Sequence, residues 1–546
     1  MWQDQAASRL PGLRALGVTG FKRFPGDPPG PATPFYVENI ATDFYSAYHR
    51  WTPDRPVTAR FDDVKALHRA NPRDLSAFVR QPSLSDPAAL AGVTARLADT
   101  VATHRADHPL YYSLGDEPGI ADLAAAWDFD LSPDSLDGMR TWLRARYGTL
   151  DALNRQWGTN YAGWEQVQPE LTTVAMARKD GNWSAWADWK EWMDESFTRA
   201  VRAGTDAVHA ADPGALAALE GAQVPGWGGY DYGRLAGAVD AMEIYDNAAN
   251  IDIALSLNPD LVVLTTSGAA GQTRQLWRDR LRGTRGLILW DENDTVVHDD
   301  GTPGPRGVAD GPVWRALAGP EAARFAAGQV RPDGVAVLYS QASFRTQWML
   351  DHAAAGDRWT ERDAEREGEN TSWRASLRGV QSALAHLALR GRWTTPDRLA
   401  ATLQEPGVSV LLLPHAVALG DNEVKTIEAF RSRGGLVLAD VPPGAFDASS
   451  RRRAALPPDL AEVVGPWPAD AAGLDALAAR LPRASVTLRH GAARAADVEA
   501  YVRWDGTTAI VGLAPDGALD EKVDVVASGP VHVLQTSPTI LTVGVP

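Results

Sequence analysis

The sequence predicts an α/β protein in which a (β/α)8 barrel is followed by two smaller domains. Over roughly the first 320 residues, short apolar segments alternate with amphipathic helical stretches, as in βα units. After residue 325, continuous apolar segments typical of buried parallel strands alternate with helices. After residue 483, short strands are separated by turn residues. We therefore expect a barrel over 1–325, a doubly wound α/β domain over 326–483 and a small β-sandwich over 484–546.

Seven segments are predicted as barrel strands, because each is short, apolar and flanked by Pro, Gly or Asp. An eighth strand either lies around 75–80 or precedes the first residue of this sequence. Helices are expected between the strands. The predicted strands are 18–24, 34–40, 110–114, 216–220, 241–245, 261–265 and 286–290, and the main helices are 87–108, 135–147 and 183–211.

The helix over 183–211 is rich in tryptophan. Trp186, Trp189 and Trp192 follow one another at spacings of three, so they should share one helix face. This spacing favours packing in the core over a binding surface.

Beyond the barrel, the chain carries a second set of predicted elements. Strands at 335–340, 408–413 and 435–439 with a helix at 421–433 indicate the doubly wound domain. No G-x-G-x-x-G follows any of these strands, so no nucleotide site is expected. Six short strands are predicted in the C-terminal domain, at 485–490, 498–504, 508–514, 522–527, 531–536 and 540–545.

Composition excludes several functional classes. The formal net charge of -16 disfavours nucleic acid and anionic membranes, whereas neutral sugars are compatible with it. The absence of cysteine excludes disulfides, thiolate metal sites and cysteine nucleophiles. No signal peptide or membrane-spanning pattern is recognised, which predicts a cytoplasmic protein or a trimmed N-terminus. His298 lies in an acidic stretch that is expected to be solvated, so no metal and no cofactor are predicted.

Carboxylates follow four of the predicted barrel strands. In a parallel barrel the carboxyl ends of the strands form the active-site mouth, so these side chains should meet at one rim. Two tryptophans, Trp227 in a glycine-rich loop and Trp290 at a strand end, are candidates for stacking on sugar rings. The acidic candidates are Asp116 and Glu117, Glu220, Glu243 and Asp246, and Glu292.

Two carboxyl groups at one mouth are the requirement for hydrolysis of a glycosidic bond. One protonates the leaving oxygen, and the other attacks the anomeric carbon or activates water. If the segment at Asp116-Glu117 is extended, the two side chains point to opposite faces. Glu117 would then enter the mouth as the acid/base, and Asp116 would support it or contact the sugar.

Two stretches resemble glycoside hydrolase family 42, a group of retaining β-galactosidases on a (β/α)8 barrel. Residues 111–119, YYSLGDEPG, look like the family's fourth strand with its acid/base site, which places that role on Glu117. Residues 138–159, GMRTWLRARYGTLDALNRQWGT, are very similar to the helix that follows this strand. The resemblance also implies a flavodoxin- or amidotransferase-like second domain that serves oligomerisation, a small β domain and a homotrimer.

The sequence departs from the family pattern at two positions. The family places Asn before its acid/base, where this chain has Asp116. The family nucleophile is a Glu that ends strand seven, whereas the matching strand here continues as Thr266-Ser267-Gly268 without a carboxylate. Glu220 and Glu243, from strands five and six, are therefore the candidates for the second carboxylate.

The remaining rim residues are assigned to substrate contact. Glu292 lies across the mouth and is expected to bind sugar or serve the structure; Tyr245 and Asp246 follow strand six, and Trp290 aligns with a sugar platform of this clan. We thus expect an exo-acting glycosidase for a galactoside-like or furanoside substrate. The alternative is a carbohydrate-binding protein on a barrel that has lost its nucleophile.

Overall fold

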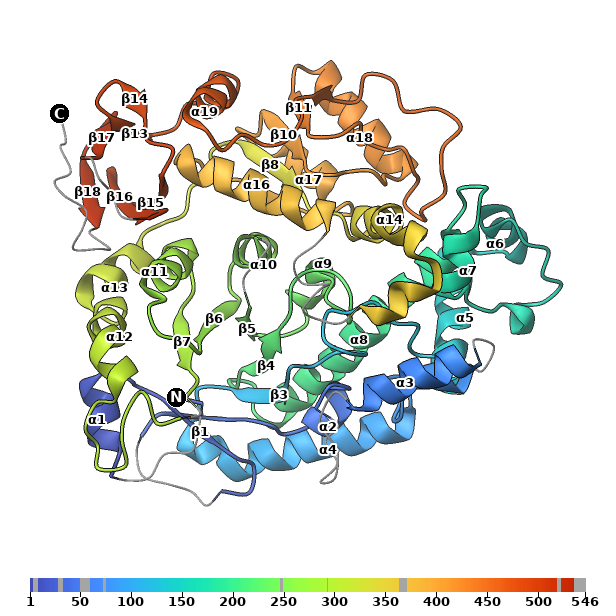
Figure 1. The fold of residues 1–546 in the computed structure, drawn as a ribbon, viewed down its shortest axis with the longest axis horizontal. Helices are drawn as coiled ribbons and strands as arrows, with labels where there is room; N and C mark the ends of the chain where they lie inside the picture. Colours follow the sequence, from blue (N-terminus) through green and yellow to red (C-terminus); the bar gives the residue numbers. More distant parts are fainter. Residues whose placement is uncertain are drawn as a thin grey trace.

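The computed structural model describes residues 1–2, 8–27, 33–49, 59–71, 75–245, 249–291, 293–362, 371–517 and 522–534. Its first part is a curled parallel sheet wrapped by helices (Figure 1). The second part, coloured yellow to orange, lies along one side of this sheet, and the red C-terminal strands lie at its end (Figure 1). In the described ranges, no helix has the length and apolar character that crossing a bilayer would need.

The curled sheet contains seven strands in sequential order, and every neighbouring pair is parallel. All seven strands predicted for the barrel are therefore confirmed, each within a few residues of its expected bounds. The strands are β1 (Phe21–Arg23), β2 (Phe35–Val37), β3 (Tyr112–Asp116), β4 (Ala217–Ala222), β5 (Ala241–Ile244), β6 (Val262–Ser267) and β7 (Gly286–Leu289).

Backbone hydrogen bonds of Met1 and Trp2 bridge the two edge strands of this sheet. The Trp2 N–H donates to the Leu289 carbonyl (2.9 Å) at the end of β7, and the Lys22 N–H in β1 donates to the Met1 carbonyl (3.2 Å). The alternative strand around 75–80 is wrong, since Leu75–Phe78 forms the 3-10 helix η1.

Local signals fix the helices that wrap the sheet. Helix α4 begins at Asp86, whose carboxylate accepts hydrogen bonds from the N–H groups of Ala88 and Ala89. Helix α5 ends at Gly148, which takes a positive φ of 70°. The helices and 3-10 helices of this part are α1 (Leu10–Ala15), α2 (Thr42–Tyr45), α3 (Ala59–Ala70), η1 (Leu75–Phe78), α4 (Pro87–His104), η2 (Arg105–Asp107), α5 (Pro133–Tyr147), α6 (Leu150–Trp157), η3 (Trp164–Gln166), α7 (Thr172–Ala177), α8 (Ser184–Ala211), α9 (Tyr232–Leu235), α10 (Asn250–Leu257), α11 (Thr273–Arg282), α12 (Pro305–Leu317) and α13 (Pro320–Ala327).

The long helix α8 packs its tryptophan face inward. Trp186, Trp189 and Trp192 are all buried within the largest apolar cluster, which confirms the core role expected from their spacing. Burial of these three indole rings stabilises the folded protein by roughly several kcal/mol.

The second part is a parallel sheet of five strands in the order β12-β11-β10-β8-β9. The strands predicted at 335–340, 408–413 and 435–439 are confirmed as β8, β10 and β11, and β9 and β12 are additional edge strands. The elements are β8 (Val335–Leu338), α14 (Gln341–His352), η4 (Ala353–Glu361), α16 (Ser372–His386), β9 (Arg392–Thr394), α17 (Leu399–Gln404), β10 (Val410–Leu413), α18 (Asp421–Ser432), β11 (Leu436–Ala439), β12 (Glu462–Val463) and α19 (Ala471–Ala478).

The C-terminal part contains two sheets of three strands, β14-β13-β17 and β15-β16-β18, which share an apolar cluster. Five of the six strands expected here are present, and the sixth, 540–545, lies outside the described residues. The strands are β13 (Val486–His490), β14 (Ala493–Arg494), β15 (Val498–Asp505), β16 (Thr508–Pro515), β17 (Asp524–Ala527) and β18 (Val531–Leu534).

Candidate active site

Acidic side chains converge where the parallel strands of the curled sheet end. Asp116 is the last residue of β3 and pairs in register with Glu220 of β4, while Glu243 lies near the end of β5. Glu38, which directly follows β2, joins them although sequence reasoning did not select it. Neighbouring strand ends thus bring the predicted carboxylates of β3, β4 and β5 into one region.

Glu117 is held by an unusual backbone conformation just beyond β3. Its φ of 40° lies in the left-handed region, which a residue with a Cβ adopts only where its surroundings enforce it. The Glu117 N–H donates to the carbonyl of Glu220 (2.9 Å). Beneath it lies Gly221, where an added Cβ would be 2.5 Å from the Glu117 Cγ. The glycine therefore provides the space in which the Glu117 side chain rests.

The expectation that Asp116 and Glu117 point to opposite faces is wrong. Nε2 of His49 lies 2.9 Å from Oε2 of Glu117 and 3.5 Å from Oδ2 of Asp116, so both carboxylates face the same imidazole. The positive φ of Glu117 breaks the alternation of an extended strand, and this is the physical reason. On the other side, the Tyr245 hydroxyl donates to Oε1 of Glu117 (3.4 Å).

Glu243 is buried beside this group and accepts two hydrogen bonds. The N–H of Gly221 donates to its Oε2, and the hydroxyl of Thr266 donates to its Oε1. Burial raises the pKa of Glu243 to about 7, and the charges of Asp116 and Glu117 act in the same direction, while the two hydrogen bonds oppose them. Thr266 of β6 thus supports the carboxylate of the neighbouring strand β5.

Glu220 belongs to the interior of the curled sheet. Its Oε1 accepts a hydrogen bond from the hydroxyl of Tyr111 (2.6 Å), whose ring stacks on that of Tyr36 with centroids 4.8 Å apart. Burial raises the pKa of Glu220 well above its ordinary value, and the charge of Glu38 adds to the rise, against the Tyr111 hydrogen bond.

Glu38 is fully buried and firmly tied to its neighbours. Its carboxylate accepts hydrogen bonds from Nε1 of Trp2 (3.0 Å) and Nδ2 of Asn39 (2.9 Å), and Nζ of Lys22 lies 3.4 Å away. Burial raises the pKa of Glu38 to about 7 although Lys22 lowers it. The signal for this residue was a carboxylate at the end of the second strand, the same rule that selected the others.

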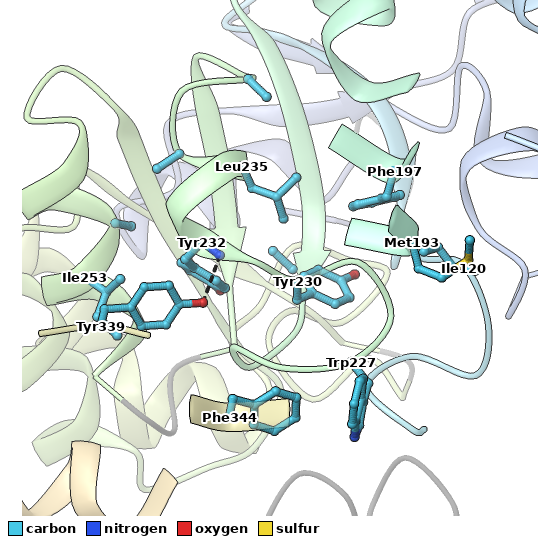
Figure 2. Packing of buried hydrophobic residues seen from close by; sticks show 14 of the residues in the cluster. Ile120, Met193, Phe197, Trp227, Tyr230, Tyr232, Leu235, Ile253, Tyr339 and Phe344 are labelled. Carbon is cyan, nitrogen blue, oxygen red and sulfur yellow. Dashed lines mark hydrogen bonds between the residues drawn. The ribbon is translucent and has the colours of Figure 1, made fainter. Parts of the chain in front are cut away.

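The structure corrects the role predicted for Trp227. Its side chain is 5% exposed and packs in the core against Trp186 of α8 and against Phe344 and Trp348 of α14. Figure 2 shows Trp227 beside Phe344, below the ring of Tyr230. The glycine-rich loop is covered by the second parallel sheet domain, so Trp227 joins two parts of the fold and does not reach the mouth.

Trp290 remains a candidate for sugar stacking. It follows β7, is 39% exposed and rests on Gly268, where an added Cβ would lie 2.9 Å from its ring. A cavity of about 390 Å³ adjoins it, and Arg306 fixes the wall by donating to the Trp290 carbonyl (2.6 Å). Asp246 and Glu292 lie outside the described residues.

The electrostatics of this mouth provide a proton near neutral pH. Burial is the main cause that raises the pKa of Asp116 to about 6, alongside the rises at Glu38 and Glu243 to about 7. Carboxylates crowded in this way titrate as a group, and they do not all ionise in neutral solution. One carboxyl can therefore act as an acid while another carries negative charge, which is the division of labour that glycoside hydrolysis requires.

Comparisons with known proteins identify similar sequences and folds. Residues 79–251, which include β3, β4 and β5, match the model of the glycoside hydrolase family 42 described as β-galactosidase. An exo-carrageenase of this family from Bacteroides ovatus has a similar fold, with a TM-score of 0.62 and 13% identity over 94% of this chain and 75% of that chain.

Two further solved structures are β-galactosidases. The enzyme from the haloarchaeon Halorubrum lacusprofundi has a TM-score of 0.56 and 15% identity over 97% of this chain and 83% of its own. The enzyme from Rahnella sp. R3 has a TM-score of 0.56 and 14% identity over 95% of this chain and 79% of its own.

A curled parallel sheet with a carboxylate-lined mouth, joined to a second parallel sheet, is the arrangement that the chain shares in fold with these structures. With the family match across its central strands, the chain is a glycoside hydrolase family 42-like barrel protein.

Proposed function

We propose that the protein is a retaining, exo-acting glycosidase in which Glu117 is the acid/base and Glu243 is the nucleophile. The observation that carries this proposal is that both residues form hydrogen bonds to the same peptide segment. The peptide segment Glu220-Gly221 accepts the N–H of Glu117 through its carbonyl and donates its own N–H to Glu243. The backbone of Glu117 and the carboxylate of Glu243 are thus both hydrogen-bonded to one peptide segment, which favours their cooperation on a single bond.

The reaction then takes two steps. Glu117 donates its proton to the glycosidic oxygen as a carboxylate oxygen of Glu243 attacks the anomeric carbon, and the carbon–oxygen bond to the leaving group breaks. Next, Glu117 as a carboxylate removes a proton from water, whose oxygen displaces Glu243 from the anomeric carbon. Each step restores the protonation state of Glu117 that the other step needs.

Glu243 is favoured over Glu220 by its surroundings. The charges that raise the pKa of Glu243 include that of Glu117, so these two carboxylates are near enough to influence one another. Glu220 instead accepts a hydrogen bond from Tyr111 in the interior, and burial raises its pKa well above the ordinary value, which opposes the ionised form that a nucleophile needs.

Tyr245 completes the arrangement as a neutral hydrogen-bond donor. Burial raises its pKa, and the charges of Glu243 and Glu117 raise it further, so the phenol keeps its proton. A hydroxyl that donates to Oε1 of Glu117 can steady this carboxylate and can also reach a sugar oxygen.

The charge of the mouth indicates an uncharged substrate. Four buried or half-buried carboxyl groups, Glu38, Asp116, Glu117 and Glu243, surround the site, and Lys22 is already paired with Glu38. A sulfated or uronic sugar would meet repulsion there. A neutral galactoside-like pyranoside or furanoside therefore fits best, with Trp290 as its stacking platform and Asp116 in contact with its hydroxyls.

The experiment that tests the assignment is azide rescue of two alanine variants on an aryl glycoside with a good leaving group. Glu243→Ala should lose turnover, and azide should restore it with a glycosyl azide of inverted anomeric configuration. Glu220→Ala should give no azide product. Rescue of Glu220→Ala in place of Glu243→Ala would move the nucleophile to strand β4. A wild-type protein that binds sugars but cleaves none would support the sugar-binding alternative, which the absent carboxylate after β6 favours.

We further propose that the unit over 326–483 mediates self-association of three copies. The analogous domain of the family suggested this arrangement, and mass measurement by light scattering tests it. A monomer at micromolar concentration would contradict it.

A further inference from the structure

His49 lies directly against the acid end of β3 and has no role in the mechanism above. It follows α2 in the chain, its side chain is 30% exposed, and its Nε2 approaches both Glu117 (2.9 Å) and Asp116 (3.5 Å). A histidine at these distances can carry a positive charge next to two carboxylates.

The loop that bears His49 is fixed to the segment that bears Glu117. The His49 N–H donates to the hydroxyl of Ser46 (3.0 Å), and Ser46 forms a parallel bridge with Gly119. The Gly119 N–H donates to the Tyr45 carbonyl (2.9 Å), and its own carbonyl accepts the N–H of Ala47 (3.2 Å). The bridge consists of these two backbone hydrogen bonds at Gly119, two residues after Glu117, and they hold the loop that bears the imidazole beside the carboxylate.

The charges that face His49 are mainly negative. Glu117 and Asp116 contact it from β3, Glu38 acts on it from the end of β2, and the Tyr48 ring packs edge-on at 5.1 Å. Lys22 is the cation behind Glu38, and it is paired there. Burial alone would lower the pKa of His49, but the contact with Glu117 and the surrounding carboxylates outweigh it and raise the pKa.

We propose that His49 is a positioning residue for the acid/base step, which orients Glu117 and sets the pH range in which Glu117 works. The proposal rests on the proposed role of Glu117. The imidazole lies on the Oε2 side of this carboxylate, at ion-pair distance, while the Tyr245 hydroxyl donates to the Oε1 side. Its positive charge favours the ionised forms of neighbouring carboxyls, so loss of that charge should move the pH profile upward.

Two substitutions separate the orienting role from the electrostatic role. His49→Gln keeps an N–H donor but has no charge, so the maximal kcat should stay within about threefold of wild type. Both limbs of its kcat/KM profile should move to higher pH by about one unit. His49→Phe removes the donor as well, and it should also lower kcat by about tenfold or more for glycosides with poor leaving groups.

His209→Gln is the matched control. His209 is also paired with a carboxylate, Asp240 at 2.8 Å, but at the opposite end of the strands. This variant should leave the pH profile unchanged. A loss of activity in His49→Gln without a shift of either limb would show a merely structural role and overturn the proposal.

A second measurement is independent of turnover. With selectively labelled histidine, NMR titration of the full chain should show His49 losing its proton at a lower pH in Glu117→Gln than in wild type, by about one unit. An unchanged His49 titration would overturn the proposal even if the protein hydrolyses glycosides. If no glycoside is hydrolysed, the proposed function fails, and the titration still decides whether the His49–Glu117 contact exists.

Discussion

Gly221 and Glu117 are packed so closely that a Cβ on Gly221 would lie 2.5 Å from the Cγ of Glu117. The same glycine has a positive φ of 64°, and its N–H donates to Glu243. One residue without a side chain thus sits between the proposed acid/base and the proposed nucleophile. The precision of the site depends on this backbone position more than on any long-range interaction.

Gly221→Ala should therefore displace Glu117 and reduce kcat by about 100-fold, because small misplacements of a catalytic group are costly. The positive φ adds strain to the variant. Steady-state kinetics on an aryl glycoside measure the effect. Gly237→Ala is the control, since a Cβ there has open space around it. Near wild-type kcat in Gly221→Ala would contradict the packing described here.

Glu117→Gln should lower kcat by about 10²–10⁴-fold for substrates that need a protonated leaving group. The loss should be much smaller for a dinitrophenyl glycoside, whose leaving group departs without a proton. The measurement is kcat of wild type and variant on each of the two substrates. Equal losses for both would indicate that Glu117 serves binding or structure.

Glu243 should make stability depend on pH in a defined direction. Its pKa rises from 4.5 to about 7 on folding. This difference corresponds to a change of about 3 kcal/mol in the free energy of unfolding between low and high pH. The folded protein holds this proton more tightly than the unfolded chain, so the stability it contributes is present below about pH 4.5 and is lost as pH rises through 7.

Glu243→Gln removes this titration, so the variant should gain stability relative to wild type between pH 4.5 and 8. Urea unfolding of both proteins across this range measures the difference. A constant difference, or one of the opposite sign, would show that the carboxyl is not buried as described. Activity should be lost in the same variant, as expected where a functional group is kept at a cost in stability.

Trp227 and Trp290, the two tryptophans that the sequence suggests for sugar stacking, should behave differently. Trp227→Ala should destabilise the protein by about 3–5 kcal/mol, since it empties a buried site between α8 and α14. Trp290→Ala should leave stability nearly unchanged and raise KM, because its exposed ring adjoins the cavity beside the mouth. Thermal unfolding and KM are measured for both variants. A raised KM with normal stability for Trp227→Ala, together with a loss of stability for Trp290→Ala, would contradict the positions of both side chains.

The strands and the general place of the site could be predicted from the sequence because they depend on local signals. Apolar segments bounded by Gly, Pro and Asp marked all seven strands, and the strand-end rule located Glu117, Glu220 and Glu243. The rule also applies to Glu38, but the predicted strand 34–40 runs past this residue, whereas β2 ends at Val37, so Glu38 falls inside the predicted strand and not at its end.

Other features depend on contacts that form only after folding. Nothing local shows that the loop of His49 folds back onto β3, or that a second domain covers Trp227. Glu117 has a positive φ and packs on Gly221 of a neighbouring strand, so the side-chain directions of Asp116 and Glu117 could not be read from their own segment.

The central claim, that Glu117 and Glu243 cooperate on one glycosidic bond, is tested most directly by trapping the covalent intermediate. The full chain would be incubated with 2-deoxy-2-fluoro glycosides of neutral sugars that carry a good leaving group, and the labelled peptide identified by mass spectrometry. We predict a glycosyl label on Glu243. A label on another residue, or none with a sugar that the protein hydrolyses, would contradict the account.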